Sequence, residues 1–234
     1  MNKLLVITGG TKGIGNAIIE KFASQKFDIV TCARKAQELM DLKVEIESKH
    51  KVEVHVYTSD LSSRENRKLF SHQVNKINRP IDVLINNVGN FVTGNILEEP
   101  DGVLESMINT NLYSAYYTTR GLIETVKKSK QGYIFNICSV AGIKIFPTAG
   151  SYSISKFAMV AFSKLLREEL KSQNIRVTTV MPGATFTGSW DGVDIEPGRL
   201  MKSEHIAQSI FDAYSMSPQS VIEEIIVRPQ LGDI

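Results

Sequence analysis

The sequence predicts a single α/β domain over residues 1–234, built as a doubly wound, mostly parallel sheet of about seven strands with helices on both faces. Three observations lead to this fold class. Seven short apolar runs alternate with longer amphipathic stretches, a glycine-rich turn follows the first run, and 234 residues suit one α/β domain. Because crossovers between parallel strands are right-handed, this alternation leaves few other arrangements.

Composition narrows the class of partner. The chain has 27 basic and 25 acidic residues, so its net charge of +2 gives no argument for nucleic acid or a membrane surface. We therefore expect a small-molecule partner. The four histidines show no ligand spacing, so no metal site is expected. Cys32 and Cys138 fall in predicted buried strands, which favours free thiols and a cytoplasmic location.

The first predicted strand, residues 4–8, leads into the turn Thr8-Gly-Gly-Thr-Lys-Gly13-Ile-Gly15 and a helix from about Ile14. Glycines let a backbone turn sharply and approach a pyrophosphate, and a helix N-terminus presents free N–H groups with a partial positive charge. Placed between a first strand and an amphipathic helix, such a turn favours dinucleotide binding over an ordinary loop.

The second predicted strand, residues 29–33, ends at Arg34 and is followed by a charged helix over residues 37–49. An NAD-type site would place a carboxylate at this strand end for the ribose 2′-hydroxyl, and there is none. Arg34 offers a planar fork for a 2′-phosphate, and Lys12 could supply a second cation. The alternative is that Arg34 only faces solvent at the start of the helix. We favour NADP(H) over NAD(H).

The third and fourth predicted strands, residues 52–58 and 81–86, are each followed by polar residues. Asp60 could meet an adenine or, equally, cap the helix over residues 62–77. Asn87 could tie neighbouring loops together, and Gly89 leaves room for a ligand.

The long helix over residues 102–127 ends in Lys127-Lys-Ser-Lys130. These cations complement the helix dipole, which we favour over docking of an acidic carrier protein.

The fifth predicted strand and the helix after it bring three reactive groups together. Ser139 ends the strand over residues 133–139, and Tyr152 and Lys156 share one face of a helix over residues 151–173. A free phenol titrates near pH ~10, and a nearby cation favours its ionised form. A hydroxyl, a phenol and a cation at one place suit proton transfer to a carbonyl oxygen.

The last third of the chain predicts a strand over residues 175–181, a helix over residues 204–214 and a strand over residues 221–227. The irregular stretch 183–202 is longer than a normal connection, which is typical of a lid or binding loop. The last strand is expected at a sheet edge. Because exposed edges are often covered by a partner subunit, we expect a homo-oligomer, and the family resemblance described below implies a homodimer or homotetramer more strongly than this edge does.

Together these motifs resemble the short-chain dehydrogenase/reductase family over essentially the whole chain. The matching motifs are Thr8-Gly9 with Gly13 and Gly15, Asp60, Asn86-Asn87-x-Gly89, Asn111, Ser139, Tyr152-x-x-x-Lys156, and Pro182-Gly183 with Thr187. The resemblance implies that Tyr152 protonates the substrate oxygen, Ser139 hydrogen-bonds it, and Lys156 makes the phenol more acidic while holding the nicotinamide ribose. Asn111 would position a water in a proton relay.

The resemblance also implies an NADP(H) site. Its residues would be Thr8, Gly9, Thr11, Lys12, Gly13, Ile14, Gly15, Arg34, Asp60, Leu61, Asn87, Gly89, Tyr152, Lys156, Pro182, Gly183, Thr185 and Thr187. Thr187 would contact the cofactor near its carboxamide, and Lys12 and Arg34 match the family's NADP-preferring members. Val88 and Cys138 stand where alanine and serine are usual in the family, and neither change removes a reacting group.

The C-terminal third resembles bacterial sepiapterin reductases and their unassigned relatives. The aromatic residues expected around the nicotinamide are Phe91, Phe146, Phe186 and Trp190. Flat aromatic walls suit a pterin or another apolar ketone, although we favour the alternative that they form a hydrophobic lid for any carbonyl substrate. Asp191 or Asp194 could pair with the amino-pyrimidine edge of a pterin, or only solvate the loop.

The predicted function is NADPH-dependent reduction of a carbonyl, in a ketone, a diketone or a pterin side chain, to an alcohol by hydride transfer. One alternative is reduction of a 3-oxoacyl group on an acyl-carrier protein. Another is a non-catalytic NADP-sensing or scaffold protein. Such a protein often loses one of the reacting residues, whereas the chain keeps all four, namely Asn111, Ser139, Tyr152 and Lys156.

Overall fold

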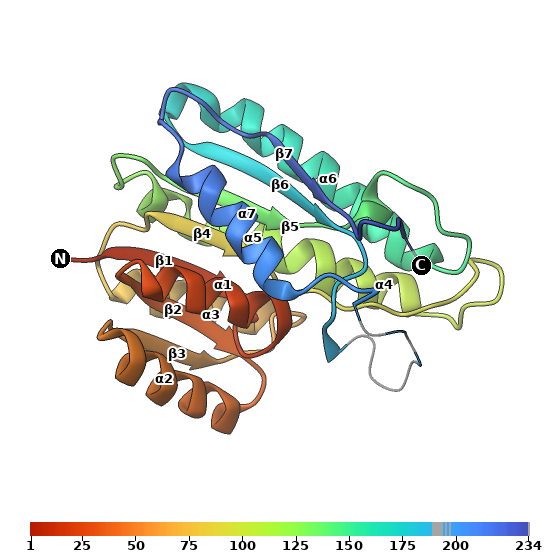
Figure 1. Cartoon of the computed structure of the whole chain (residues 1–234), viewed down its shortest axis with the longest axis horizontal. Helices are drawn as coiled ribbons and strands as arrows, with labels where there is room; N and C mark the ends of the chain where they lie inside the picture. Colours follow the sequence, from red (N-terminus) through yellow and green to blue (C-terminus); the bar gives the residue numbers. More distant parts are fainter. Residues whose placement is uncertain (189–193, 195, 197, 234) are drawn as a thin grey trace.

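A parallel sheet runs through the middle of the molecule (Figure 1). The computed structural model describes residues 1–188, 194, 196 and 198–233. Within these residues the strands are β1 Lys3–Thr8, β2 Phe27–Ala33, β3 Val54–Thr58, β4 Val83–Asn86, β5 Tyr133–Ile137, β6 Arg176–Pro182 and β7 Glu224–Val227. Their order across the sheet is β3-β2-β1-β4-β5-β6-β7, with every neighbouring pair parallel. The predicted doubly wound α/β fold is confirmed.

Helices cover both faces of this sheet (Figure 1). One face carries α1 Gly13–Ser24, α2 Ala36–His50 and α7 Ser203–Ser215. The other carries α3 Arg64–Lys76, α5 Ser114–Val126 and α6 Gly150–Leu170. Shorter elements are α4 Val103–Met107, a π-helix over Ile108–Tyr113, and 3-10 turns over Val140–Gly142 and Lys171–Gln173.

β1 shows why the strand sequences are apolar throughout. Leu5 and Ile7 belong to the core that α1 and α7 cover, whereas Leu4 and Val6 belong to the core that α3 and α5 cover. All four side chains are at most 1% exposed. Because helices cover both faces, a central parallel strand needs apolar residues at every position.

The position of β1 in the sheet places the functional site. β1 has β2 on one side and β4 on the other, so the chain moves outward in opposite directions from this point. In open α/β sheets such a reversal opens a crevice beyond the carboxyl ends of the strands, where ligands bind. Residues that follow β1, β2, β4 and β5 line clefts at this edge of the sheet.

Most predicted boundaries shift by one to three residues in the structure, and two elements need comment. The helix predicted over residues 102–127 is divided into α4, the π-helix and α5. An extra residue in a helical turn rotates the side chains that follow, so the π-helix decides which of them faces α6. The strand predicted over residues 221–227 begins only at Glu224, and it lies at the sheet edge as expected.

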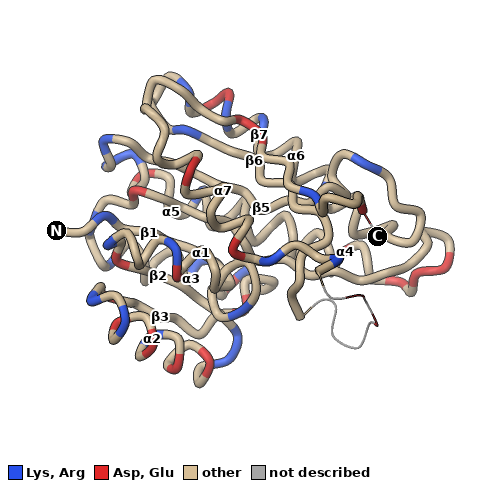
Figure 2. Tube along the Cα trace, viewed as in Figure 1, with Lys and Arg blue, Asp and Glu red and all other residues tan. Residues whose placement is uncertain are grey.

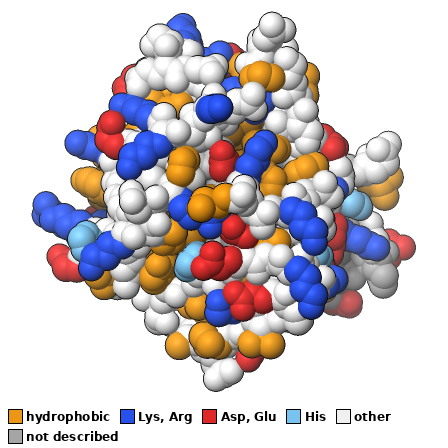
Figure 3. All heavy atoms as spheres, turned by 90° about the vertical axis from the view of Figure 1, so that its left-hand side faces the viewer, with side chains coloured by type: hydrophobic (Ala, Val, Ile, Leu, Met, Phe, Trp, Pro, Cys, Tyr) orange, Lys and Arg blue, Asp and Glu red, His pale blue; other side chains and the backbone are white. Residues whose placement is uncertain are grey.

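Charges are spread over the surface. Figure 2 shows basic and acidic residues interspersed along the surface helices, and Figure 3 shows basic, acidic and apolar side chains intermixed on the face that it views. Among the described residues, no helix could cross a bilayer and no group of three or more His, Cys, Asp or Glu side chains could hold a metal ion. Cys32 and Cys138 are buried free thiols, and burial raises the pKa of each to about 12.

Candidate active site

Tyr152 and Lys156 lie one turn apart on α6, beside the carboxyl end of β5. Lys156 is 4% exposed, and its ammonium donates a hydrogen bond to the Ile137 carbonyl at 3.2 Å. The same nitrogen lies 5.7 Å from the centre of the Tyr152 ring. A buried cation at this distance stabilises the negative charge that develops on a phenol oxygen as it releases a proton.

Asn111 reaches the same place from the π-helix. Its side chain is fully buried, and its amide nitrogen donates to Ser155 Oγ at 2.9 Å and to the Asn90 carbonyl at 3.0 Å. Its carbonyl oxygen accepts from the Asn90 N–H at 2.7 Å. Single π-helical turns inside α-helices are frequent at functional sites. Here the turn lets Asn111 tie the loop after β4 to α6, which carries Tyr152.

Ser139 follows β5 and caps the 3-10 turn Val140–Gly142. The Ala141 N–H donates to Ser139 Oγ at 3.1 Å, so the oxygen accepts while the hydroxyl proton stays available for donation. Ser139 and Tyr152 line the same pocket. A carbonyl oxygen between them could therefore accept a hydrogen bond from each hydroxyl.

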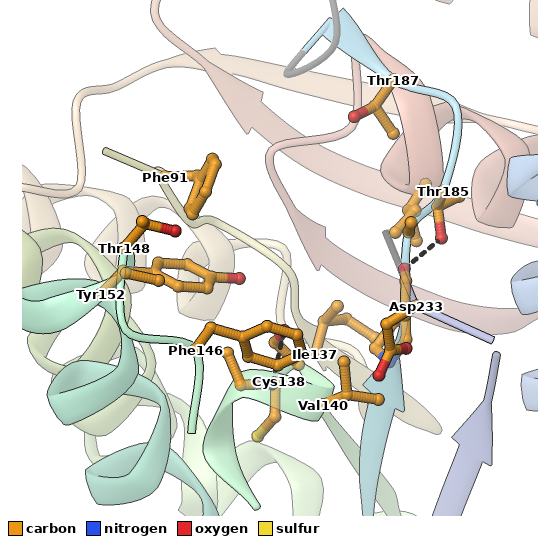
Figure 4. Close-up of a pocket in the computed structure, with 17 residues that line it drawn as sticks. Phe91, Ile137, Cys138, Val140, Phe146, Thr148, Tyr152, Thr185, Thr187 and Asp233 are labelled. Atoms are coloured by element: carbon orange, nitrogen blue, oxygen red, sulfur yellow. Dashed lines mark hydrogen bonds between the residues drawn. The ribbon is translucent and has the colours of Figure 1, made fainter. Parts of the chain in front are cut away.

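The pocket that these hydroxyls share has a volume of about 280 Å³ (Figure 4). Figure 4 shows the Tyr152 hydroxyl pointing into its middle, with the rings of Phe91 and Phe146 on either side. The rings of Phe91 and Tyr152 meet edge to face, with centroids 4.8 Å apart. Val140 and Ala149 add to the apolar wall.

Asp233, close to the C-terminus, forms the wall of the pocket on the opposite side from Tyr152 (Figure 4). Its side chain is 8% exposed, and its carboxylate pairs with Lys144 at 3.1 Å and with Arg228 at 2.7 Å. The guanidinium of Arg199 donates to the backbone carbonyls of Gly232 at 2.9 Å and Asp233 at 3.1 Å. Three separate segments therefore hold the C-terminal residues against the pocket.

A second, larger cleft of about 830 Å³ adjoins this pocket at Tyr152, which lines both. The cleft extends from Lys156 past the glycine-rich turn to Arg34 after β2. Gly9 has φ +73°, and a Cβ on Gly15 would lie 2.2 Å from the Gly9 carbonyl oxygen. The turn therefore requires glycine, and the first turn of α1 lines the cleft with free N–H groups that suit a pyrophosphate.

Comparison with known proteins agrees with this geometry. Residues 3–196 match the family model described as short chain dehydrogenase. The chain belongs to the short-chain dehydrogenase family. This short-chain dehydrogenase is 35% identical to the sepiapterin reductase of Chlorobaculum tepidum across 100% of its own length and 99% of that protein. It is 31% identical to the (S)-acetoin-forming diacetyl reductase of Staphylococcus epidermidis across 92% of its own length and 83% of that protein.

Solved structures share the fold. L-sorbose reductase from Gluconobacter frateurii, complexed with NADPH and L-sorbose, is 25% identical with a TM-score of 0.90, over 97% of this chain and 95% of that one. A metagenomic short-chain oxidoreductase in complex with NADP is 28% identical with a TM-score of 0.83, over 97% of each chain. The resemblances inferred from the sequence, to the family and to sepiapterin reductases, are confirmed.

The large cleft of this short-chain dehydrogenase gathers most residues predicted to bind the cofactor. These are Gly9, Thr11, Lys12, Gly13, Ile14, Gly15, Arg34, Asp60, Leu61, Asn87, Gly89, Tyr152, Lys156 and Thr187. Thr8 does not line it. Thr8 is 2% exposed and its hydroxyl oxygen accepts the N–H groups of Asn87 at 3.0 Å and Val88 at 3.1 Å, which joins the ends of β1 and β4. The smaller pocket, rather than the cleft, is lined by Pro182, Gly183 and Thr185.

Asp60 lines the cleft and shapes the turn before α3. The Ser62 N–H donates to the Asp60 carboxylate at 3.0 Å, and this bond, with the nearby Arg34 charge, holds the pKa of Asp60 below its ordinary value. The N-cap of α3 is Ser63, whose Oγ accepts from the Asn66 N–H at 3.4 Å. Asp60 is therefore not the helix cap, and its contact with an adenine stays a prediction.

The predicted substrate-side aromatic residues have different placements. Phe91 and Phe146 line the pocket. Phe186 does not line it and is 70% exposed, and its backbone carbonyl accepts from Ser203 Oγ at 3.2 Å at the start of α7. The structure therefore does not place Phe186 at the substrate. Asp194 is exposed and does not line the pocket. Trp190 and Asp191 lie outside the described residues.

Glu38 is a cleft residue that the sequence analysis missed. It lies in the first turn of α2 and pairs with Lys12 at 3.0 Å and with Lys35 at 3.1 Å. Hydrogen bonds from Lys12 and Lys35 hold the pKa of Glu38 below its ordinary value. The strand end itself carries no carboxylate, but the first turn of α2 brings Glu38 to the cleft wall that Arg34 also lines. Helical spacing from Lys35 was the available signal.

Ser155 and Asp233 were also missed. Ser155 Oγ donates to the Tyr152 carbonyl at 2.7 Å while it accepts from Asn111, so it links the π-helix to α6. Nothing in its sequence position separates it from a buried helical serine. Asp233 is 89 positions from Lys144 in the chain, and only the folded structure brings the two together.

Proposed function

We propose that this short-chain dehydrogenase reduces the carbonyl group of a ketone or diketone to an alcohol, with NADPH as the hydride donor. The observation that carries the proposal is the position of Tyr152. Its side chain lines both the glycine-walled cleft and the smaller pocket, and the buried Lys156 ammonium lies beside its ring. A proton donor at this junction is where a hydride and a carbonyl carbon would meet.

The chain's own residues account for the proton half of the reaction. Bound NADPH would supply a hydride to the carbonyl carbon. Tyr152 donates its phenol proton to the carbonyl oxygen, Ser139 donates a hydrogen bond to the same oxygen, and Lys156 stabilises the charge left on the phenol oxygen. The carbonyl gains one hydride and one proton and becomes an alcohol, so the atoms and charges balance.

The choice of NADPH rests on the cations around the second strand's end. Lys12, Arg34 and Lys35 line the part of the cleft where the adenine ribose of a dinucleotide is expected. A guanidinium and ammonium groups bind a 2′-phosphate more strongly than a 2′-hydroxyl. The two solved relatives described above were crystallised with NADPH or NADP, which supports the same choice here.

The pocket supports a neutral, apolar substrate. Its charged lining residue, Asp233, is already paired with Lys144 and Arg228, so among the described lining residues no unpaired charge is offered to a ligand. The aromatic rings of Phe91 and Phe146 provide flat apolar contact. A small ketone or diketone fits these walls, and a pterin with a carbonyl side chain has the matching flat shape.

The basic run at residues 127–130 does not strengthen the acyl-carrier alternative. It lies just before the start of β5, whereas the pocket lies beyond the opposite, carboxyl end of that strand. Lys127 also pairs with Glu124 at 2.7 Å, as a cation at a helix end commonly does.

A homodimer or homotetramer in the cytoplasm remains our proposal for the assembly and its location.

A substrate panel tests the proposed function. Purified protein is incubated with NADPH and one of four carbonyl compounds: diacetyl, a pterin with a carbonyl side chain, an apolar ketone or an acetoacetyl thioester. Loss of NADPH absorbance is then measured. We expect turnover of the diketone, the pterin or the ketone. Turnover of the thioester alone would select the acyl-carrier reaction, and NADPH binding without turnover of any compound would favour the sensor or scaffold role.

A further inference from the structure

The wall of the cofactor cleft next to β2 carries a compact cluster of opposite charges. The ammonium groups of Lys12 and Lys35 lie 3.0 and 3.1 Å from the same oxygen, Oε1 of Glu38. The Thr11 hydroxyl lies 3.5 Å from the other carboxylate oxygen, Oε2. The two lysine side chains are 69% and 71% exposed, and the Glu38 side chain is 29% exposed. With Arg34, all of these residues line the cleft.

Separate segments of the fold build this cluster. Lys12 stands at the N-cap of α1, Lys35 stands at the N-cap of α2, and Glu38 lies in the first turn of α2. Figure 2 shows basic and acidic residues following one another along α2. In a dinucleotide-binding fold the 2′ position of the adenine ribose lies at this place, just beyond the second strand. The ammonium groups that a 2′-phosphate would use therefore already bind an internal carboxylate.

We infer that Glu38 is a specificity-determining residue that limits the preference for NADPH over NADH, because it acts as an internal counter-ion for Lys12 and Lys35. The inference rests on the proposed function, since it presupposes a nicotinamide dinucleotide in the cleft. A 2′-phosphate must either separate the lysines from Glu38 or accept the carboxylate as a like-charged neighbour, and both are unfavourable. A 2′-hydroxyl meets neither obstacle, since it can donate a hydrogen bond to the carboxylate.

The charge state of Glu38 agrees with this role. Hydrogen bonds from the two lysines lower its pKa, so the carboxylate is ionised near neutral pH. Three cations, namely Lys12, Arg34 and Lys35, still outnumber the one carboxylate. The wild-type chain therefore prefers NADPH, but by less than the cations alone would allow.

A simpler role for Glu38 is stabilisation of the α2 N-terminus, where an acidic residue in the first turn favours the helix dipole. The two roles predict different results. Loss of a helix-stabilising charge lowers the unfolding temperature and leaves the ratio of cofactor affinities unchanged. Loss of a counter-ion raises that ratio.

The test compares Glu38→Gln with Glu45→Gln. Glu45 is exposed on the same helix and does not line the cleft, so the control makes the same change in net charge away from the nucleotide. Dissociation constants for NADPH, NADH, 2′,5′-ADP and 5′-AMP are measured by titration calorimetry at fixed salt. We expect Glu38→Gln to bind NADPH and 2′,5′-ADP at least about threefold more tightly than the wild type does. This is the size of effect that a single solvent-exposed charge contact usually has.

We expect Glu38→Gln not to tighten the binding of NADH or 5′-AMP, and Glu45→Gln to leave all four constants at the wild-type values. If Glu38→Gln leaves the NADPH-to-NADH affinity ratio unchanged or lowers it while the wild type binds NADPH, the inference about Glu38 fails and the proposed function stands. If Glu45→Gln raised the NADPH-to-NADH affinity ratio as much as Glu38→Gln does, the effect would come from net charge, and the inference would also fail. If the wild type binds neither NADPH nor 2′,5′-ADP, both proposals fall.

Discussion

At the scale of single residues, the site depends on a buried ammonium whose direct partner is a carbonyl. Lys156 donates to the Ile137 carbonyl and approaches the Tyr152 ring, and a Cβ on Gly89 would lie 3.4 Å from its nitrogen. Burial of a cation is costly unless it is hydrogen-bonded. Lys156 also lines the large cleft, and the proposed role in stabilising charge on the phenol oxygen would account for a cation at this buried position.

Arg34 gives a prediction about the cofactor. We expect kcat/KM with NADPH to exceed that with NADH by about tenfold or more, since a charge-assisted contact contributes about 1.5–3 kcal/mol. Arg34→Gln should reduce this ratio by about tenfold, mainly through a higher KM for NADPH. Initial rates with both cofactors measure it. Equal kcat/KM values for NADPH and NADH in the wild type would refute the assignment.

At the scale of elements, the π-helix between α4 and α5 is the feature that sequence patterns could not predict. The apolar periodicity of residues 102–127 is compatible with one continuous helix, because a single inserted residue shifts the pattern by less than a third of a turn. The motif containing Asn111 was recognised from the sequence. Its hydrogen bonds to Asn90 and Ser155 depend on the rotation that the π-helix introduces.

Asn111→Ala is expected to weaken the connection between the loop after β4 and α6. The substitution removes the hydrogen bonds to Asn90 and Ser155, so we expect a loss of about 1–3 kcal/mol in the free energy of unfolding and a lower kcat. Urea unfolding and initial rates measure the two effects. Asn111→Asp keeps the acceptor for the Asn90 N–H but places a carboxylate oxygen against the Asn90 carbonyl, so it should not restore the lost stability. Unchanged stability and kcat in Asn111→Ala would contradict this role.

The C-terminal segment predicts a pH-dependent contribution to stability. Burial raises the pKa of Asp233, but hydrogen bonds and charges from Arg228 and Lys144 outweigh it and hold the pKa below its ordinary value. A lowered folded-state pKa gives stability that is present above the unfolded-state value of about 3.9 and is lost as pH falls through the folded-state pKa. Asp233→Asn should therefore be less stable than the wild type at about pH 7, with a smaller difference near pH 3.

Urea midpoints for the wild type and Asp233→Asn at several pH values measure this contribution. Glu98→Gln is a suitable control, because Glu98 is an exposed carboxylate that does not line the substrate pocket. The account of Asp233 would be wrong if its substitution cost the same stability at both ends of the pH range. Because Asp233 lines the pocket, the variant should also raise KM for the carbonyl substrate more than KM for NADPH.

At the scale of the whole molecule, the sequence predicts the fold and the order of the motifs well. Strands with apolar residues at every position indicate a sheet covered on both faces, and the glycine-rich turn marks its first crossover. Contacts between distant segments were not predictable. Glu38 returns to the cleft through helix geometry, Asp233 meets Lys144 only after folding, and Thr8 joins two strands instead of lining the cleft.

Cofactor binding should stabilise the molecule as a unit, because the cleft is built from segments that follow β1, β2, β3, β4 and β5. A ligand present at about 100 times its Kd stabilises the folded state by about 2.7 kcal/mol, which raises Tm by roughly 5–10 °C for a domain of this size. We expect this shift with NADPH and a smaller one with NADH at the same concentration. A larger shift with NADH, measured by thermal unfolding, would contradict the cofactor assignment.

The central claim is that Tyr152 delivers a proton while a hydride reaches the same carbonyl group. It is tested most directly by a single turnover of the best substrate of the panel with NADPH deuterated at the transferred position. For the wild type we predict an alcohol with one deuterium on the former carbonyl carbon. For Tyr152→Phe, which should still bind NADPH, we predict a rate lower by about a hundredfold or more. A wild-type rate in Tyr152→Phe, or an alcohol without deuterium, would contradict the account.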